Sequence, residues 1–293
     1  MSPWLIGFTV FFAYPLLSTV YFSFMKYDGF RAPAFSGLDN WIYVFRDYPG
    51  FWPAMGNTLW LVVVMVTLRV VFGLGIGMLI TRIKLGTGIF RTLFYLPYLA
   101  PPVAATLGFV FLLNPGTGPV NAFLESAGLP SPGWFTDPTW SKPALTLLAV
   151  WGIGDLMVIF MAALLDVPQD QYEAASLDGA SAWQRFRFVT LPNISPILLF
   201  AVVTGVIQTM QYYTQPLVAG KVASGIIGGS GQTFEPGYPE KSTLTLPQLV
   251  YNLGFQRFDY GSACVVALVL FALSMAFTAL LMRRRGGLIQ AGD

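Results

Sequence analysis

The sequence predicts an all-α integral membrane protein with six transmembrane helices. Its 293 residues are 55% hydrophobic and only 10% charged, whereas soluble domains carry charge on about a quarter of their residues. A helix crosses the hydrocarbon layer of a bilayer with about 20 apolar residues, and six segments reach that length. These spans are expected at residues 4–25, 57–81, 92–113, 143–165, 193–218 and 258–282, within one transmembrane domain over residues 1–293.

The first apolar segment is expected to be a retained helix rather than a signal peptide. It lacks the basic n-region and the small-x-small cleavage site of a signal, and its apolar run is long for an h-region. With six spans, both chain ends then lie on the same side of the membrane.

The distribution of Lys and Arg predicts that this side is the cytoplasm. Connections 82–91 and 166–192 and the tail 283–293 hold eight Lys or Arg in 48 residues. The opposite connections, 26–56, 114–142 and 219–257, hold seven in 99 residues. Because short cytoplasmic loops carry the excess of basic residues, both termini are expected in the cytoplasm.

The composition also excludes several classes of chemistry. The chain has no histidine, which removes the commonest general base and metal ligand. Its single cysteine, Cys264, cannot form an intrachain disulfide or a thiolate cluster. A net charge of +2 gives no basic field for nucleic acid, and no phosphate-binding G-x-x-x-x-G-K-[ST] motif occurs. We therefore expect no metal, no cofactor and no ATP site in this chain.

The connection 166–192 predicts two short helices joined by a tight turn. Pro168 can open the first helix, because a proline in the first turn loses no needed donor, and Gly179 can close it in a left-handed conformation. Ser181 and Gln184 have the spacing of a capping box, which begins a second helix.

The end of this connection is expected at two prolines. Pro192 and Pro196 should terminate the second helix and direct the chain into the fifth span. A helix pair of this kind either lies as an amphipathic element on the membrane surface or protrudes as a docking site for a cytoplasmic partner.

The residues of this connection resemble the EAA loop of type I ABC-importer permeases. The matching positions are Glu173, Ala174, Ala175, Asp178, Gly179, Ala180, Phe186, Leu191 and Pro192. Elsewhere, segments such as FFAYPLLSTVYFSF, FRTLFYLP and LLNPGTGPVNAFL look like carbohydrate-uptake permeases of the maltose-transporter type, in the subunit that pairs with a second, different permease. The Gly- and Ser-rich stretch 225–237 departs from that pattern as an outer-loop insertion.

This resemblance implies the fold of type I ABC-importer permeases and a place in the cytoplasmic membrane of a bacterium or archaeon. It also implies four kinds of partner: a second permease, two cytoplasmic ATPase subunits that bind ATP and Mg²⁺, an extracytoplasmic solute-binding protein and a sugar-class solute. In that family the loop is the coupling helix held by the ATPase. Glu173 would then face a basic group, Gly179 would permit the turn, and Phe186 would anchor the second helix.

Two ionisable residues fall near the middle of expected spans, Arg69 in the second and Asp155 in the fourth. A charge at this depth is costly, so each is a functional candidate. The two side chains either form a structural ion pair or lie along the path of the solute.

The fifth expected span carries a run of polar residues. Gln208, Gln211, Tyr212 and Gln215 follow the spacing i, i+3, i+4 and i+7, which places them on one face of a continuous helix. Amides and aromatic rings suit sugar hydroxyls and ring faces, although polar residues also hold membrane helices together. Asn252, with Gln256, is a further candidate for the solute path.

Three other functions can be formulated. An ion-coupled secondary transporter would use Asp155 as its coupling carboxylate. An intramembrane aspartyl protease would use Asp155 of the G-x-G-D segment with Asp28, but Asp28 lies beyond the end of the first span, and that chemistry needs two adjacent carboxylates. A rhomboid-type serine protease at 228–231 would lack its histidine base.

Overall fold

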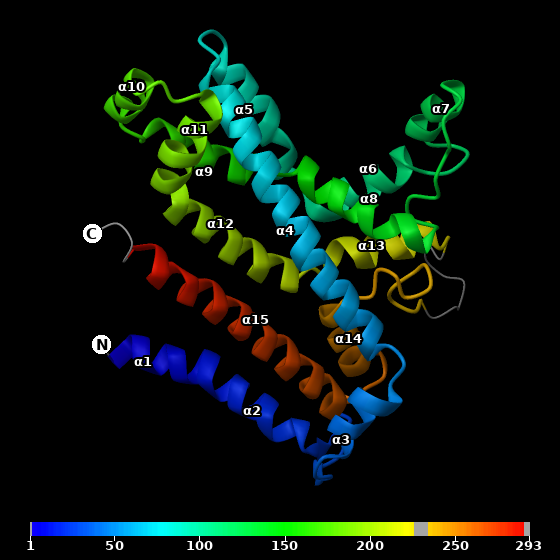
Figure 1. Ribbon diagram of the computed structural model, residues 1–293. Coiled ribbons are helices and arrows are strands. Elements are labelled where there is room, and N and C mark those ends of the chain that lie inside the picture. The colour runs from blue at the N-terminus through cyan, green and yellow to red at the C-terminus, as the bar shows by residue number, and fades with distance from the viewer. Residues whose placement is uncertain (1, 226–233, 290–293) are drawn as a thin grey trace.

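The computed structural model describes residues 2–225 and 234–289 and consists mainly of long helices (Figure 1). Of the insertion expected at 225–237, residues 226–233 lie outside the described residues. The elements of the candidate membrane spans are α1 (Ser2–Phe8), η1 (Thr9–Ala13), α2 (Tyr14–Ser23), α4 (Phe51–Thr81), α5 (Thr87–Tyr95), η3 (Leu96–Leu99), α6 (Pro102–Leu112), α8 (Pro138–Trp151), α9 (Gly154–Leu165), α12 (Leu191–Met210) and α15 (Tyr260–Ile289). Two short elements, α11 (Ala182–Arg185) and η4 (Phe186–Thr190), lead into α12.

Shorter elements connect these helices. They are β1 (Met25–Lys26), β2 (Ala34–Phe35), α3 (Asp39–Ile42), η2 (Tyr43–Asp47), α7 (Pro119–Ser126), α10 (Gln169–Leu177), α13 (Thr214–Ala223), α14 (Leu246–Tyr251) and η5 (Asn252–Gln256). The two strands form an antiparallel pair in which Met25 lies opposite Phe35.

The six expected spans correspond to four uninterrupted helical segments and two bent pairs. The uninterrupted segments run over Ser2–Ser23, Phe51–Thr81, Ala182–Met210 and Tyr260–Arg283. The third span bends by 97° between Leu99 and Pro102, and the fourth bends by 50° between Trp151 and Gly154. Consecutive prolines cause the first bend, because a proline ring and its missing N–H prevent a helix from continuing.

The two bends lie against each other at Gly154. A Cβ atom on Gly154 would lie 2.7 Å from Tyr95 Cα and 2.8 Å from the carbonyl oxygen of Phe94. Only a residue without a side chain allows the start of α9 to approach the end of α5 this closely. The close contact brings the broken parts of the third and fourth spans together, and the cavity described below is built around them.

The fifth span begins earlier than the sequence predicts. Pro192 and Pro196 were expected to end a helix, but one helical segment continues through both from Ala182 to Met210. Immediately before Pro192 the backbone forms a π-helical turn, in which the N–H of Leu191 donates to the carbonyl of Phe186. Such a wide turn relaxes the helix where the proline ring would otherwise clash with the preceding carbonyl. That prediction is therefore wrong.

The same span also ends earlier than predicted, at Met210 rather than near residue 218. Pro216 explains the break, because in a continuous helix it would have to donate an N–H to the carbonyl of Tyr212. Instead, the hydroxyl of Thr245 donates to that carbonyl at 3.0 Å. The chain then begins a separate helix, α13, at Thr214.

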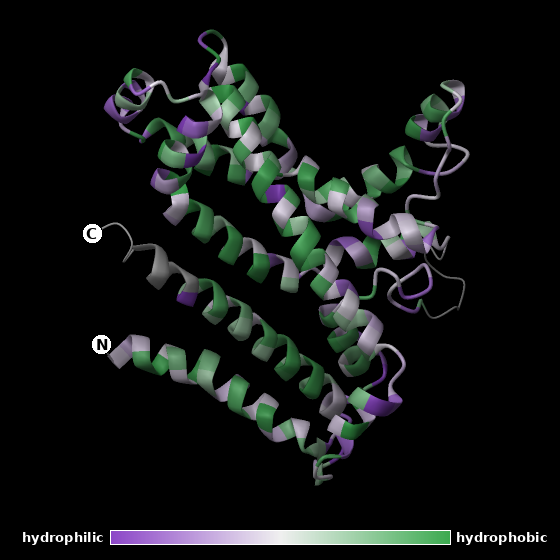
Figure 2. Cartoon of the chain, in the orientation of Figure 1, coloured by the Kyte–Doolittle hydropathy of each residue, from purple (hydrophilic) through white to green (hydrophobic). Residues whose placement is uncertain are grey.

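The hydrophobic core follows α4, which packs against α9 and α12. Val62, Val66, Val70 and Leu74 are buried along one side of α4, together with Phe160 of α9. In the cartoon of Figure 2 the long helices are coloured mostly as hydrophobic, and most strongly hydrophilic residues lie near helix ends and connections. The start of α1 and the end of α15 lie on the same side of the molecule as α10 (Figure 1).

Candidate functional site

Two regions of the structure bear on function: residues 169–190, which we call the handle, and a cavity near the far end of α12. The handle consists of α10, a tight turn, α11 and η4. Every residue of α10 and α11 is at least partly exposed. Leu177 is 90% exposed and Trp183 is 65% exposed, so the handle offers apolar side chains to solvent or to a partner.

The turn of the handle is fixed by its backbone. Gly179 has a φ angle of 77°, in the left-handed region, as the sequence predicts. The N–H of Ala180 donates to the carbonyl of Ala175 at 2.9 Å, and the N–H of Gly179 donates to the carbonyl of Ser176 at 3.1 Å. These two bonds form the Schellman arrangement that closes a helix at a glycine.

The second helix of the handle begins with the predicted capping box. The N–H of Ser181 donates to Oε1 of Gln184 at 2.7 Å, and the N–H of Gln184 donates to Oγ of Ser181 at 3.3 Å. This reciprocal pair satisfies two backbone donors that a free helix end would leave open. The predicted capping box is thus confirmed.

Side-chain hydrogen bonds brace α10 against the rest of the handle and the start of α12. Arg185 Nη1 donates to Ser176 Oγ at 2.9 Å, and the hydroxyls of Tyr172 and Thr190 are 2.9 Å apart. Asn193 Nδ2 donates to Gln171 Oε1 at 2.7 Å. These three bonds connect α10 directly to the helical segment that ends at Met210.

The predicted docking residues fall on different parts of this braced unit. Glu173, Ala174 and Asp178 are exposed on α10 and at its end. Phe186 packs against the core formed by α4, α9 and α12, and Leu191 packs against the same core. Pro192 is exposed within the continuous helix.

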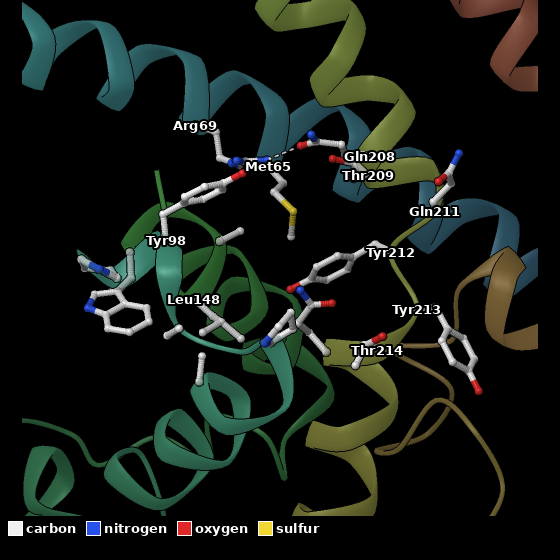
Figure 3. Close-up of a pocket in the computed structure, with 18 residues that line it drawn as sticks. Met65, Arg69, Tyr98, Leu148, Gln208, Thr209, Gln211, Tyr212, Tyr213 and Thr214 are labelled. Carbon is white, nitrogen blue, oxygen red and sulfur yellow. Dashed lines mark hydrogen bonds between the residues drawn. The ribbon is translucent and has the colours of Figure 1, made fainter. Parts of the chain in front are cut away.

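At the opposite end of α12 lies a cavity of about 430 Å³. Its lining comes from α4, the break between η3 and α6, the end of α8, and the segment from α12 to α13. Figure 3 shows Tyr98 and Tyr212 directed into this space from opposite sides. The volume is within the range of about 300–1,000 Å³ that is typical of small-molecule sites.

The four polar residues predicted in the fifth span all line the cavity, although the reason given for their proximity is wrong. Gln208 belongs to α12, Gln211 follows its end, Tyr212 lies in the break, and Gln215 belongs to α13. They therefore do not share one helical face. The chain break brings them to a common space instead.

Arg69 and Asp155 lie within ion-pair distance. Arg69 Nη2 is 3.3 Å from Asp155 Oδ1 and 3.4 Å from Oδ2. Arg69 Nη1 donates to Gln208 Oε1 at 3.2 Å (Figure 3). The side chains of Arg69 and Asp155 are 13% and 18% exposed. Arg69 lines the cavity, and Asp155 contacts Arg69 from the first turn of α9.

Two polar atoms of the cavity lining have no hydrogen-bond partner among the residues that the structure describes. They are Nε of Arg69 and the hydroxyl of Tyr212, both buried. A buried polar atom without a partner costs free energy. Both atoms are buried, so neither is open to a solute in this structure.

Asn252, which the sequence also predicts on the solute path, does not line this cavity. Its Nδ2 donates to Gln256 Oε1 at 2.6 Å, and the Tyr48 hydroxyl donates to its Oδ1 at 3.4 Å. Asn252 lines a separate pocket of about 180 Å³ beside Glu235 and Arg257. Burial raises the pKa of the Tyr48 phenol above its usual value, so the phenol stays protonated and keeps this bond.

Several lining residues were missed from the sequence, including Tyr98, Trp151 and Thr214. Tyr98 and Trp151 lie beside the breaks at Pro101 and Gly152. Prolines and glycines within long apolar segments could have indicated them, because irregular backbone at membrane depth is tolerated where it lines a cavity.

The protease arrangement is not present in the described residues. Asp28 Oδ1 accepts N–H bonds from Arg31 at 2.8 Å and from Phe30 at 3.0 Å. These backbone bonds, with that from Arg31 the strongest, hold the pKa of Asp28 below its usual value. Asp155 is paired with Arg69, so each carboxylate has its own partners rather than a shared proton.

Residues 36–286 match the family described as binding-protein-dependent transport system inner membrane component. The chain belongs to this family. The probable ABC transporter permease YesP of Bacillus subtilis strain 168 is 32% identical to the permease over 284 residues, which cover 97% of this chain and 88% of YesP. The lactose transport system permease LacF of Rhizobium radiobacter is 32% identical over 286 residues, which cover 94% of this chain and 90% of LacF.

A solved structure supports the fold. A chain of a bacterial ABC transporter involved in the import of the acidic polysaccharide alginate matches the permease with a TM-score of 0.75 and 22% identity, over 97% of this chain and 93% of that chain. The permease has the type I ABC-importer fold. It is a multi-pass inner-membrane subunit of a binding-protein-dependent importer.

Proposed function

We propose that the permease forms half of the path for a sugar-class solute and that the handle couples this path to a separate cytoplasmic ATPase. The observation that carries the proposal is the continuous helical segment Ala182–Met210. It begins in the handle and ends at the cavity. Its 29 residues span roughly 43 Å at the rise of an α-helix.

This geometry explains how motion at one end reaches the other. The three hydrogen bonds from α10 hold the handle to the segment, and Phe186 and Leu191 pack the segment against the core. A partner that displaces α10 therefore displaces α12 as a rigid element, and with it Gln208 at the cavity wall. Rigid-element shifts of this kind transmit conformational changes in proteins.

A complete importer contains further subunits. Two ATPase subunits bind ATP and Mg²⁺, a second permease completes the path, and an extracytoplasmic binding protein delivers the solute. Both termini and the handle lie in the cytoplasm, and the permease itself needs no cofactor. The excess of Lys and Arg in connections 82–91 and 166–192 supports this orientation.

A sugar-class solute is supported by the lining of the cavity and by one relative. Glutamine amides, tyrosine hydroxyls and the rings of Tyr98, Tyr212 and Trp151 surround the space. Amides and hydroxyls can both donate and accept hydrogen bonds, and aromatic faces suit the apolar side of a sugar ring. LacF, whose name assigns it to lactose transport, is similar to the permease along nearly its whole length.

An ion-coupled secondary transporter is less well supported. Its coupling carboxylate, Asp155, would have to release and rebind an ion during transport. That carboxylate is engaged by Arg69 through both oxygens, and the chain belongs to a binding-protein-dependent family.

Cysteine crosslinking tests the coupling role of the handle. Cys264 is the only cysteine, so a Cys264→Ser background allows a single new thiol. Leu177→Cys, at a position 90% exposed in the handle, should crosslink to the ATPase in intact cells. Leu129→Cys, at a position 53% exposed between α7 and α8, is the control and should not. Equal capture from both positions, or none from Leu177→Cys, would refute the coupling role.

Uptake into proteoliposomes tests the cargo. The assembled importer with its binding protein is offered a panel of labelled mono- and disaccharides, with ATP and without it. Accumulation of at least one sugar only with ATP is the expected result. Accumulation that follows an ion gradient in the absence of ATP would favour the secondary transporter.

A further inference from the structure

Membership of the family does not determine whether the cavity accepts neutral or charged solutes. One relative is named for lactose, which is neutral, and the structural neighbour belongs to an importer of an acidic polysaccharide. In the described part of the chain, Arg69 is the only charged residue among the 18 that line the cavity. The cavity can therefore favour anionic solutes only if this guanidinium is available to form an ion pair with them.

The guanidinium of Arg69 is already engaged. Nη2 lies 3.3 and 3.4 Å from the two oxygens of Asp155, and Nη1 donates to Gln208 at 3.2 Å. Nε is buried and faces no open space. Two of the three nitrogens thus have acceptors, and the third is out of reach of a solute.

Asp155 supplies the opposite charge beside Arg69. It lies in the first turn of α9, a helix of 12 residues, and the N-terminal end of a helix carries partial positive charge. With Asp155 ionised beside Arg69, the charges of the pair cancel. The wall of the cavity is then electrically neutral, although it contains a cation.

We infer that the cavity selects uncharged, polyhydroxylated solutes against anionic ones, and that Asp155 sets this preference by neutralising Arg69. This inference rests on the proposed role of the cavity as part of the solute path. A neutral sugar can replace its hydrogen bonds to water with hydrogen bonds to the amides of Gln208, Gln211 and Gln215. A carboxylate or sulfonate would lose its hydration without finding a free cation, and such desolvation is costly.

The test compares two sugars of the same shape, methyl β-glucoside and methyl β-glucuronide. The importer is assembled in nanodiscs without its binding protein, so that delivery does not mask the preference of the cavity. Saturation-transfer difference NMR on an equimolar mixture then reports the ratio of the two bound sugars. In the wild type, the glucoside should dominate.

Variants of the ion pair should change this ratio in a defined pattern. Asp155→Asn keeps the shape and an acceptor for Arg69 but frees its charge, so the ratio should shift toward the glucuronide by about tenfold, the scale of one hydrogen bond to a charged group. Arg69→Gln combined with Asp155→Asn removes both charges and should restore the wild-type ratio.

A matched control separates local charge from total charge. Glu235→Gln also adds one positive charge and frees an arginine, Arg257, whose Nη2 lies 3.9 Å from the Glu235 carboxylate. These residues line the separate pocket beside Asn252. The ratio should therefore stay at the wild-type value.

The outcomes distinguish this inference from the proposed function. If neither sugar gives a signal in any variant, the cavity is not part of the solute path and both ideas fail. If both sugars bind but Asp155→Asn leaves the ratio unchanged, or the double variant keeps the shift, only the inference fails. If Asp155→Asn does not assemble, the wild type still tests the inference. A wild-type preference for the glucuronide overturns it.

Discussion

The handle and the cavity differ in how far apart in the sequence their contacting residues lie. The side-chain hydrogen bonds that brace the handle join residues 9, 18 and 22 positions apart. Those of Arg69 at the cavity join residues 86 and 139 positions apart. A local unit can be altered without disturbing the packing of the spans, whereas a change at the cavity affects several spans at once. Variants in the handle should therefore change coupling, and variants at the cavity should also change stability.

The largest effect on stability is expected from breaking the ion pair. Arg69→Met leaves Asp155 as an unpaired charge among packed helices, which should lower the free energy of unfolding by about 3–5 kcal/mol. The decrease should appear as a lower melting temperature of the purified importer, measured by size-exclusion chromatography after heating.

A double variant that removes both charges provides the control. Asp155→Leu combined with Arg69→Met removes both charges and should recover most of the lost stability, because apolar replacements of a buried pair are often neutral. A double variant as unstable as Arg69→Met alone would show that the pair does not act as a unit.

The largest effect on coupling is expected at the turn of the handle. Gly179→Val places a β-branched residue at a φ angle of 77°, which such residues rarely adopt, so the turn should rearrange. Transport should decrease at least tenfold, a change that corresponds to about 1.4 kcal/mol. Uptake and the amount of protein in the membrane are both measured.

Gly86→Val is the matched control for this variant. Gly86 has a φ angle of 79°, and like Gly179 it has open space where a Cβ would lie. The backbone strain is thus the same, but Gly86 belongs to the connection between α4 and α5. Equal losses of transport in both variants would attribute the effect to general strain rather than to the handle.

The same contrast explains what could be read from the sequence. The capping box at Ser181 and the left-handed Gly179 depend on a few neighbouring residues, so spacing alone predicts them. The six apolar spans and their family resemblance likewise follow from composition and local motifs. The resemblance identified the fold and the family that the comparisons show.

The remaining features depend on contacts that spacing does not reveal. Pro192 lies within a helix because a π-helical turn precedes it. Pro216 interrupts the helical run after Met210, and Thr245 supplies a donor to the carbonyl that the break leaves open. Gln208 and Gln215 meet at the cavity through that break rather than through helical periodicity. The polarity of these residues therefore marks them in the sequence, but helical periodicity does not predict how they meet.

A smaller loss of stability is expected when the long-range hydrogen bond at the break is removed. Thr245 is 1% exposed, and Thr245→Val keeps its shape but leaves the carbonyl of Tyr212 without this donor and also removes the side-chain half of the capping box at the start of α14. The free energy of unfolding should decrease by about 1–3 kcal/mol. Thermal melting of the purified importer measures the loss, and Thr19→Val is the control, because its hydroxyl donates to Pro15 within one exposed helix.

The smallest effect is expected when a local hydrogen bond of the handle is removed. Ser181→Ala deletes the side-chain half of the capping box, which should destabilise the start of α11 by about 1 kcal/mol. Because α11 continues into η4 and α12, this loss should loosen the end of the handle and leave the spans packed. Hydrogen exchange should therefore accelerate at the N–H of Gln184, while the melting temperature of the importer stays at its wild-type value. A decrease in melting temperature as large as that of Thr245→Val would contradict the separation of the handle from the membrane core.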